Sequence, residues 1–211
     1  MILRSPRERP RDEGVSAGTG EPIGAILAGG FGRRIGGAKA VVQLCGRPLV
    51  CYPLQALQAA LPEVMLLAKA DTKLPSLRGV TVWVESDPRR HPLVGILEAL
   101  SVASGRSIVV CAADLPLITP GLIARLATVA VGEAPAVVVR CQQVVQPLLG
   151  LYTPAAGPLL GRALAGGDPR LLDAVESIGS RYLEVDDPEL LFNVNAPEDL
   201  LQAAAIIDSR R

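Results

Sequence analysis

The residues best suited to chemistry lie between Leu27 and Lys39, in the segment LAGGFGRRIGGAK. Its glycines allow backbone N–H groups to approach an anion, because no Cβ stands in the way. Arg33, Arg34 and Lys39 add positive charge within reach of the same loop. Glycines and cations at the end of a short apolar run predict a polyphosphate site at the carboxyl edge of an open α/β sheet.

The spacing of this segment distinguishes between three kinds of phosphate-binding loop. A P-loop has glycine immediately before its lysine and serine or threonine after it, whereas Lys39 has alanine on both sides. A dinucleotide-binding loop has the pattern GxGxxG, whereas Gly30, Gly32 and Gly36 give GxGxxxG. The sequence also lacks the acidic residue that holds a ribose about 20 residues further on. The spacing therefore excludes the first loop and disfavours the second.

The third kind is the nucleotidyltransferase loop, LAGG-x-x-x-R-x-G-x-x-K, which fits at every position with Arg34 and Lys39 as its constant cations. Attack at an α-phosphorus requires that the triphosphate be held in line while pyrophosphate leaves with additional charge. Backbone amides and the two cations can stabilise that charge. The alternative is a glycine-rich turn whose arginines face solvent.

A loop of this kind also needs a divalent metal, and Mg²⁺ prefers oxygen ligands. Asp114 is the candidate, since it follows the apolar run 107–112 and so belongs to the same carboxyl edge. Alternatively, it caps the helix that begins near Pro120, although it lies rather far upstream. Asp87 follows the apolar run 80–84 at this edge and either orders a loop on the substrate side or is only an Asp-Pro turn residue.

Two asparagines, Asn193 and Asn195, precede the last predicted helix. A spacing of two residues on an extended segment directs both amides to the same side. Because Pro197 stands near the first helical position, we expect Asn195 to cap this helix and Asn193 to reach toward the site.

The turn Pro92-Leu93-Val94-Gly95 opens another helix, whose N-terminus could offer amide donors to a ligand. His91 lies just before this turn. Since a phosphate nucleophile is already ionised near neutral pH, the reaction does not need a histidine base. We therefore expect His91 to be a loop residue.

The elements that must position these residues follow from apolar runs and helix-like patterns. Proline near a first turn marks several helix starts. Strands are predicted at 23–28, 64–68, 80–84, 107–112, 136–140, 147–152 and 181–185, and helices at 48–60, 93–103, 120–130, 154–164, 171–178 and 197–207. Strands between helices that rarely alternate in polarity predict a mostly parallel sheet covered on both faces. We expect a three-layer α/β/α domain over residues 21–211 and a disordered extension over residues 1–20.

Bulk composition limits the class of protein. The 21 basic residues balance the 21 acidic ones, so no overall field draws the chain to nucleic acid or to a membrane surface. The four cysteines stand far apart and there is a single histidine, which argues against a structural zinc site. Cys111 is expected to pack as a small apolar residue. Unpaired thiols, together with a chain that has no transmembrane-length run and no signal peptide, predict a cytoplasmic protein.

These residues resemble the motifs of the molybdenum cofactor guanylyltransferases, the MobA family within the GT-A-like nucleotidyltransferase fold. The family's motifs occur in its order from about Pro22 to about Ala205. They are the loop LAGG-x-x-x-R-M-G-x-x-K at 23–39 with Ile35 for methionine, the PLAG turn at 92–95, the D-x-P segment at 113–116, the HP-x-x-ALY strand at 146–152 and the N-x-N-x-P-E-D-L ending at 192–200. The resemblance implies a Rossmann-like α/β/α domain.

The resemblance further implies transfer of GMP from magnesium-bound GTP to the phosphate of the molybdenum cofactor (molybdopterin), with release of pyrophosphate. GTP, molybdopterin and molybdoenzyme-assembly proteins are the implied partners, and Mg²⁺ is the implied cofactor. The expected catalytic residues are Arg34, Lys39 and Asp114, with Asp114 also the metal ligand. The expected substrate-binding residues are Leu27, Ala28, Gly29, Gly30, Gly32, Lys39, Lys69, Asp87, Asp114, Asn193 and Asn195.

Three departures leave the base and the acceptor open. Ala38 replaces a common aspartate, Gly32 a small hydroxyl residue and Gln146 a histidine. A relative that transfers CMP usually reads LAAG in the loop, so Gly29 favours guanine. The alternatives are another nucleotidyltransferase of this fold, using CTP or acting on a sugar or organic phosphate, and a non-catalytic nucleotide-binding partner in molybdoenzyme assembly.

Overall fold

The computed structural model describes residues 2–4, 20–29 and 39–210. Its strands are β1 (Ile2–Arg4), β2 (Ile23–Leu27), β3 (Gln43–Leu44), β4 (Arg47–Pro48), β5 (Val64–Ala68), β6 (Thr81–Val84), β7 (Ile108–Ala112), β8 (Ala136–Cys141), β9 (Val144–Tyr152) and β10 (Arg181–Glu184). Its helices are α1 (Cys51–Ala60), α2 (Pro92–Val102), α3 (Pro120–Thr128), α4 (Ala156–Ala165), α5 (Leu171–Ser177) and α6 (Pro197–Ser209), with 3₁₀ turns η2 (Lys39–Val41) and η3 (Pro188–Leu191). Each helix and strand predicted from the sequence is present, with small shifts at the ends.

The main sheet has eight strands in the order β1-β6-β5-β2-β7-β9-β8-β10. Only β9 runs antiparallel to its neighbours, so the prediction of a mostly parallel sheet is confirmed. Ile26 on β2 pairs in register with Leu66 on β5 and with Cys111 on β7. All residues of β5 and β7 are buried, as expected of parallel strands covered on both faces.

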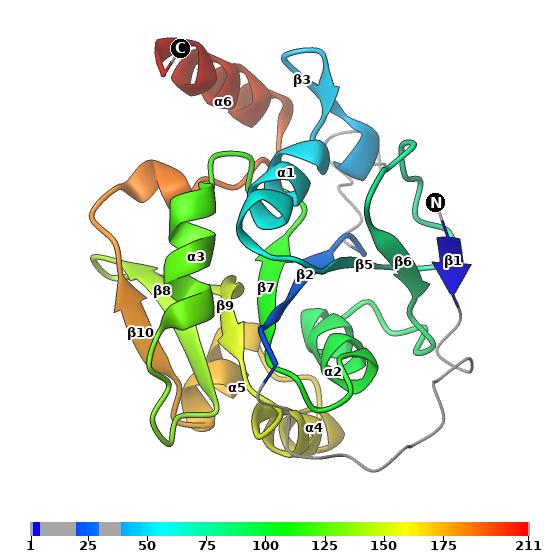
Figure 1. Ribbon diagram of the computed structural model, residues 1–211, viewed down its shortest axis with the longest axis vertical. Coiled ribbons are helices and arrows are strands. Elements are labelled where there is room, and N and C mark those ends of the chain that lie inside the picture. The colour runs from blue at the N-terminus through cyan, green and yellow to red at the C-terminus, as the bar shows by residue number, and fades with distance from the viewer. Residues whose placement is uncertain (1, 5–19, 30–38, 211) are drawn as a thin grey trace.

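Helices cover both faces of this sheet and give the expected three layers (Figure 1). On one face α1 packs beside α3, and Leu57 and Leu126 meet strand residues such as Leu66. On the other face α2, α4 and α5 pack against strand residues such as Leu67 and Val110. Successive strand residues therefore point into opposite cores, which is the side-chain period of a strand.

A small third cluster joins the last helix to a hairpin that the sequence analysis missed. Strands β3 and β4 pair in antiparallel fashion around a turn in which Cys45 and Gly46 both have positive φ. Val194 and Ala203 pack against Leu44 of this hairpin, so α6 lies beside β3 (Figure 1). The sequence did not reveal this hairpin, because strands of two residues are too short to show a period. Its last residue, Pro48, was predicted as the first residue of the helix 48–60.

Within the segment 1–20, which was expected to be a disordered extension, the structure describes residues 2–4 and 20. Residues 2–4 form β1, which pairs in parallel with Thr81–Trp83 at the edge of the sheet. A strand edge presents unpaired backbone groups, and β1 pairs with those of β6. Residues 5–19 lie outside the described residues.

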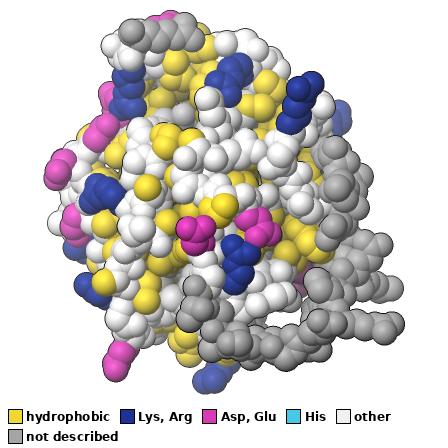
Figure 2. Space-filling view, in the orientation of Figure 1, with side chains coloured by type: hydrophobic (Ala, Val, Ile, Leu, Met, Phe, Trp, Pro, Cys, Tyr) yellow, Lys and Arg dark blue, Asp and Glu magenta, His cyan; other side chains and the backbone are white. Residues whose placement is uncertain are grey.

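The surface carries charges of both signs. Figure 2 shows basic and acidic side chains interspersed over the face in view, in agreement with the balanced net charge.

Cys111 is fully buried in the core, as expected, and burial raises the pKa of its thiol well above the usual range. Within the described part of the chain, none of the helices has the length and apolar character needed to cross a membrane.

Candidate active site

The candidate site lies at the carboxyl ends of four neighbouring parallel strands. Residues that directly follow β2, β5, β6 and β7 line one cavity of about 480 Å³; they are Ala28, Lys69, Glu85 and Ala113. Strand order reverses at β2, because β5 and β6 lie to one side of it and β7 to the other. Open α/β sheets bind ligands at such a switch point. The cavity therefore lies at the position where this type of fold binds its ligands.

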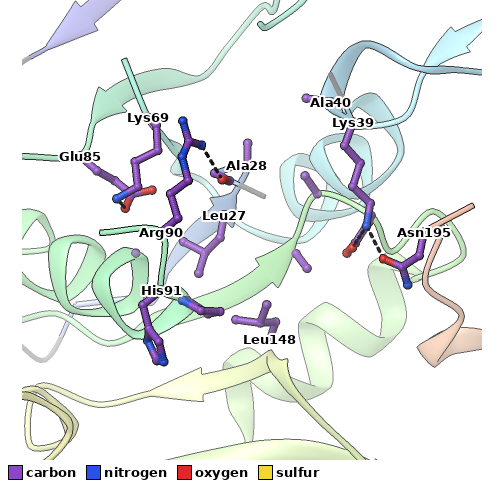
Figure 3. A pocket seen from close by; sticks show the side chains of 16 residues that line it. Leu27, Ala28, Lys39, Ala40, Lys69, Glu85, Arg90, His91, Leu148 and Asn195 are labelled. Atoms are coloured by element: carbon purple, nitrogen blue, oxygen red, sulfur yellow. Dashed lines mark hydrogen bonds and ion pairs between the residues drawn. The ribbon is translucent and has the colours of Figure 1, made fainter. Parts of the chain in front are cut away.

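Charged and polar side chains gather at two sides of this cavity (Figure 3). Lys39 and Asn195 lie on one side, and Asp114 belongs to that side because it pairs with Lys39. Lys69, Glu85 and Arg90 lie on the other side. Of the residues expected to bind substrate, the cavity brings together Leu27, Ala28, Gly29, Lys39, Lys69, Asp114 and Asn195. Gly30, Gly32 and Arg34 lie outside the described residues.

On the first side, the Lys39 ammonium forms an ion pair with Asp114 and donates a hydrogen bond to Asn195 Oδ1 at 2.6 Å. The side chains of Lys39 and Asp114 are only 12% and 18% exposed. Lys39 begins η2, directly after the loop, while Asp114 follows β7. The backbone N–H of Val194 also donates to the Asp114 carbonyl at 3.0 Å, which holds the asparagine segment against the end of β7.

The second carboxylate oxygen of Asp114, Oδ1, is buried and has no hydrogen-bond partner among the described residues. A buried acceptor without a donor is costly, and carboxylate oxygens are the usual ligands of Mg²⁺. The Asn195 amide oxygen adds a second oxygen donor nearby. Mg²⁺ commonly takes one or two protein carboxylates and completes its shell with phosphates and water. The residues present therefore fit a magnesium ion bound together with a nucleotide.

The two asparagines do not have the positions expected of them: Asn195 lines the cavity without capping α6, and Asn193 does not line it. Ala196, not Asn195, is the N-cap of α6, and Asp199 accepts hydrogen bonds from the backbone N–H groups of Asn195 and Ala196 at 2.7 and 2.8 Å. Because a carboxylate one turn into the helix satisfies these donors, the Asn195 amide is free to bond Lys39. Asn193 does not line the cavity and instead accepts from Gln146 Nε2 at 3.4 Å.

On the second side, Lys69 and Glu85 form an ion pair of 2.6 Å between side chains that are 7% and 4% exposed. The Lys69 ammonium also donates to the Asp87 carbonyl at 2.7 Å. Burial raises the pKa of Glu85, although the Lys69 ammonium opposes this effect. A Cβ added to Gly29 would lie 3.0 Å from Glu85 Oε1. The pair is therefore packed directly against the start of the glycine loop.

Asp87 does not point into the cavity, contrary to the substrate-binding role expected for it. Its carboxylate accepts from the backbone N–H of Arg89 at 2.8 Å and from the Arg89 guanidinium at 2.6 Å. These hydrogen bonds lower the pKa of Asp87. The structure thus favours the alternative of an Asp-Pro turn residue. Glu85, which the sequence analysis missed, occupies the cavity because it is the first residue after β6; position alone could have found it.

The start of α2 lines the cavity through His91, Pro92 and Gly95. His91 caps this helix, since Leu93 N donates to Nδ1 at 3.1 Å, and its Nε2 contacts the Pro169 carbonyl at 2.8 Å. Val94 N bonds the His91 carbonyl, so these two first-turn amides already have partners and are not free for an anion. Gly95 allows close packing, because a Cβ there would lie 3.2 Å from Leu27.

Two further cavity residues were not singled out from the sequence. Leu148 enters the cavity from β9, where the register with β8 shifts between Val138 and Val139. Such a bulge re-aims side chains, and proline, here Pro147, is tolerated in strands at these points. Arg90 lies along the opposite wall, forms an ion pair with Asp71 and approaches the Gly29 carbonyl at 3.5 Å.

Comparisons with known proteins show the family of this chain. Residues 24–180 match the family model of the MobA-like NTP transferase domain. The chain is 32% identical to a molybdenum cofactor guanylyltransferase of Cereibacter sphaeroides, over 88% of this chain and 96% of that one. It is 30% identical to the enzyme of the same name from Vibrio cholerae, over 86% and 90% of the two chains.

Solved structures show the same fold. Molybdopterin-guanine dinucleotide biosynthesis protein A from Archaeoglobus fulgidus superposes with a TM-score of 0.71 at 25% identity, covering 89% of this chain and 99% of that one. The 2-C-methyl-D-erythritol 4-phosphate cytidylyltransferase of Thermus thermophilus superposes with a TM-score of 0.63 at 19% identity, covering 87% and 98%. The second likeness concerns the fold alone.

Proposed function

The chain belongs to the MobA-like NTP transferase family, and we propose that it transfers GMP from GTP to the phosphate of the molybdenum cofactor, releasing pyrophosphate. One observation carries the proposal beyond the family. A single cavity has a metal-type carboxylate with a lysine at one side and a donor–acceptor pair suited to a base at the other.

At the triphosphate side, Lys39 is the residue that we propose to bind the phosphates. Pyrophosphate leaves with more charge than the bound triphosphate has at that bond, so a fixed cation stabilises the transition state more than the ground state. Arg34 is expected from the sequence to stabilise the same charge, and we include it in the proposal with that role. Gly29 leaves the backbone at the end of β2 open to the nucleotide.

Asp114, with Asn195 beside it, is the residue proposed to hold Mg²⁺. When bound, the ion would neutralise phosphate charge and polarise the phosphoryl group that is attacked. Asp114 must be ionised for this role. Its place between β7 and the segment 193–195 keeps the carboxylate at the switch point of the sheet.

At the base side, Glu85 and Lys69 match the edge of guanine. Guanine presents two adjacent donors, N1–H and the 2-amino group, beside one acceptor, O6. A carboxylate accepts from two donors at once, and an ammonium donates to O6. Cytosine presents one amino donor beside two acceptors, so it matches this pair less well. The low exposure of both side chains would make a mismatch costly.

No side chain has to act as a general base, because the acceptor phosphate is already ionised near neutral pH. His91 lines the cavity, but both of its ring nitrogens are engaged in holding α2 and the Pro169 carbonyl. We therefore assign His91 a role in shaping the cavity wall.

All four cysteines are free, which suits a protein of the reducing cytoplasm.

Pyrophosphate release from each of the four nucleoside triphosphates, with and without molybdopterin, tests the proposal. We expect release from GTP that depends on both molybdopterin and Mg²⁺. Release from CTP alone would replace guanine by cytosine in the proposal. Binding of GTP without release under any condition would indicate a nucleotide-binding partner and not an enzyme.

A further inference from the structure

The Lys39 ammonium lies where the two best oxygen donors of the site converge. It pairs with Asp114 Oδ2 and donates to Asn195 Oδ1 at 2.6 Å, while the other oxygen of Asp114 is buried without a partner among the described residues (Figure 3). A magnesium ion fits Asp114 Oδ1 and Asn195 Oδ1, so it would share the Asp114 carboxylate and the Asn195 amide oxygen with Lys39. Two cations, the Lys39 ammonium and the proposed magnesium ion, therefore compete for the same acceptor groups.

We infer that Lys39 and a divalent cation are alternative partners of Asp114, so that the ammonium must leave this carboxylate when a metal ion binds there. The inference rests on the proposed function, since it takes Asp114 as the metal ligand. Two cations on one carboxylate repel each other strongly when the groups are largely shielded from water. The Lys39 and Asp114 side chains are 12% and 18% exposed, so this shielding applies.

The lysine is well placed to change partners. Its ammonium is a point charge on a flexible four-carbon stem. Its backbone starts η2, immediately after the loop that is expected to bind the triphosphate. A nucleotide that arrives with its metal would thus supply new anionic oxygens for Lys39 at the moment the ion takes Asp114. A metal ion alone offers Lys39 no such compensation.

This exchange couples metal and nucleotide binding. The metal alone must displace an ion pair and is expected to bind weakly, whereas the metal with its triphosphate leaves Lys39 paired. Because binding couplings are reciprocal, the nucleotide strengthens metal binding by the same factor as the metal strengthens nucleotide binding. Lys39 therefore has opposite effects on the two: it opposes the bare ion and favours the metal–nucleotide complex.

Binding of Mn²⁺ alone to the full chain without nucleotide, followed by electron paramagnetic resonance, tests the inference. We expect Lys39→Met to bind Mn²⁺ about tenfold more tightly than the wild type, the scale of one lost hydrogen bond between charged groups. Lys39→Gln should show the same gain, which covers failure of the first variant to fold. Lys73→Met removes an exposed lysine as a matched control and should bind as the wild type does.

Adding Asp114→Asn to Lys39→Met should abolish the gain, which would locate the ion at Asp114. Unchanged or weaker Mn²⁺ binding in both Lys39 variants overturns the inference, as does a gain that persists without Asp114. Affinity for Mg-GTP should change in the opposite direction, falling about tenfold in Lys39→Met. Because the Mn²⁺ measurement uses neither GTP nor molybdopterin, wild-type guanylyl transfer with unchanged Mn²⁺ binding would reject this inference and retain the proposed function.

Discussion

Glu85 Oε1 lies 3.0 Å from the place where a Cβ on residue 29 would stand, so the first glycine of the loop and the carboxylate after β6 are packed against each other. That distance is shorter than an ordinary carbon–oxygen contact. Residue 29 is where relatives that use CTP are expected to have alanine. The contact provides a physical link between the loop and the base side of the cavity.

Gly29→Ala should therefore displace Glu85 and lower the preference for GTP over CTP. The side-chain carboxylate can shift, so we expect a rise of several-fold in the KM for GTP and little loss of stability. Steady-state kinetics with both nucleotides measures this ratio. An unchanged ratio would show that residue 29 and Glu85 do not act together on the base.

Glu85→Gln should reduce discrimination between GTP and ITP, which lacks the 2-amino group. An amide has one acceptor oxygen and cannot receive both guanine donors as a carboxylate does. We expect the wild type to favour GTP by about tenfold or more, and the variant to favour it by much less. Glu133→Gln, on an exposed turn, is the control. If discrimination survives in Glu85→Gln, another group reads the base.

Arg90→Ala should raise the KM for GTP by about two- to fivefold, with kcat little changed, because a partly exposed cation on the cavity wall adds binding that is similar in ground and transition states. Its neighbour is a matched control. Arg89 is bound to Asp87 and does not line the cavity, so Arg89→Ala should leave KM alone. Equal effects of the two substitutions would indicate a general electrostatic contribution instead.

Asp114→Asn should lower kcat by at least about 100-fold, the scale for loss of a group that stabilises developing charge. The substitution keeps the size of the side chain but removes the charge that pairs with Lys39 and is proposed to hold Mg²⁺. A thermal melt checks that the fold persists. Near-normal turnover at high Mg²⁺ would contradict the metal role.

Asp199→Ala should lower the free energy of unfolding by about 1 kcal/mol, as expected for loss of a helix cap. It removes the acceptor for two backbone N–H groups just before α6, so the segment that carries Asn195 should also move. We expect lower kcat together with the stability loss in urea unfolding. Glu198→Ala removes an exposed acidic residue from the same first turn and separates the cap from the effect of charge on the helix dipole.

Local patterns in the sequence were sufficient for seven of the eight strands of the main sheet, all but β1, and for its helices. Apolar runs of the right length marked β5 and β7, and proline near a first turn marked the start of α3, which Thr119 caps in the structure. These features depend on backbone geometry and burial over a few residues, and such information is contained in adjacent side chains. The position of Asp114 at the edge of the sheet followed from the same rule.

Only the tertiary structure decided which side chains meet at that edge. Asp87 and Glu85 stand two residues apart, yet Arg89 binds the first carboxylate while Lys69, from another strand end, pairs with the second. Asn195 bonds Lys39 because Asp199 satisfies the backbone that the asparagine was expected to cap. In each case several partners compete for one polar group.

The sequence by itself determined the fold class and the strand ends that carry the site, and it predicted the phosphate-binding loop. The structure alone decided the pairing of Lys39 with Asp114, which stand 75 residues apart in the chain, and the entry of Leu148 through a shifted register. The physical reason is that secondary structure follows local periodicity, whereas hydrogen bonds and ion pairs are chosen among all groups that folding brings within reach.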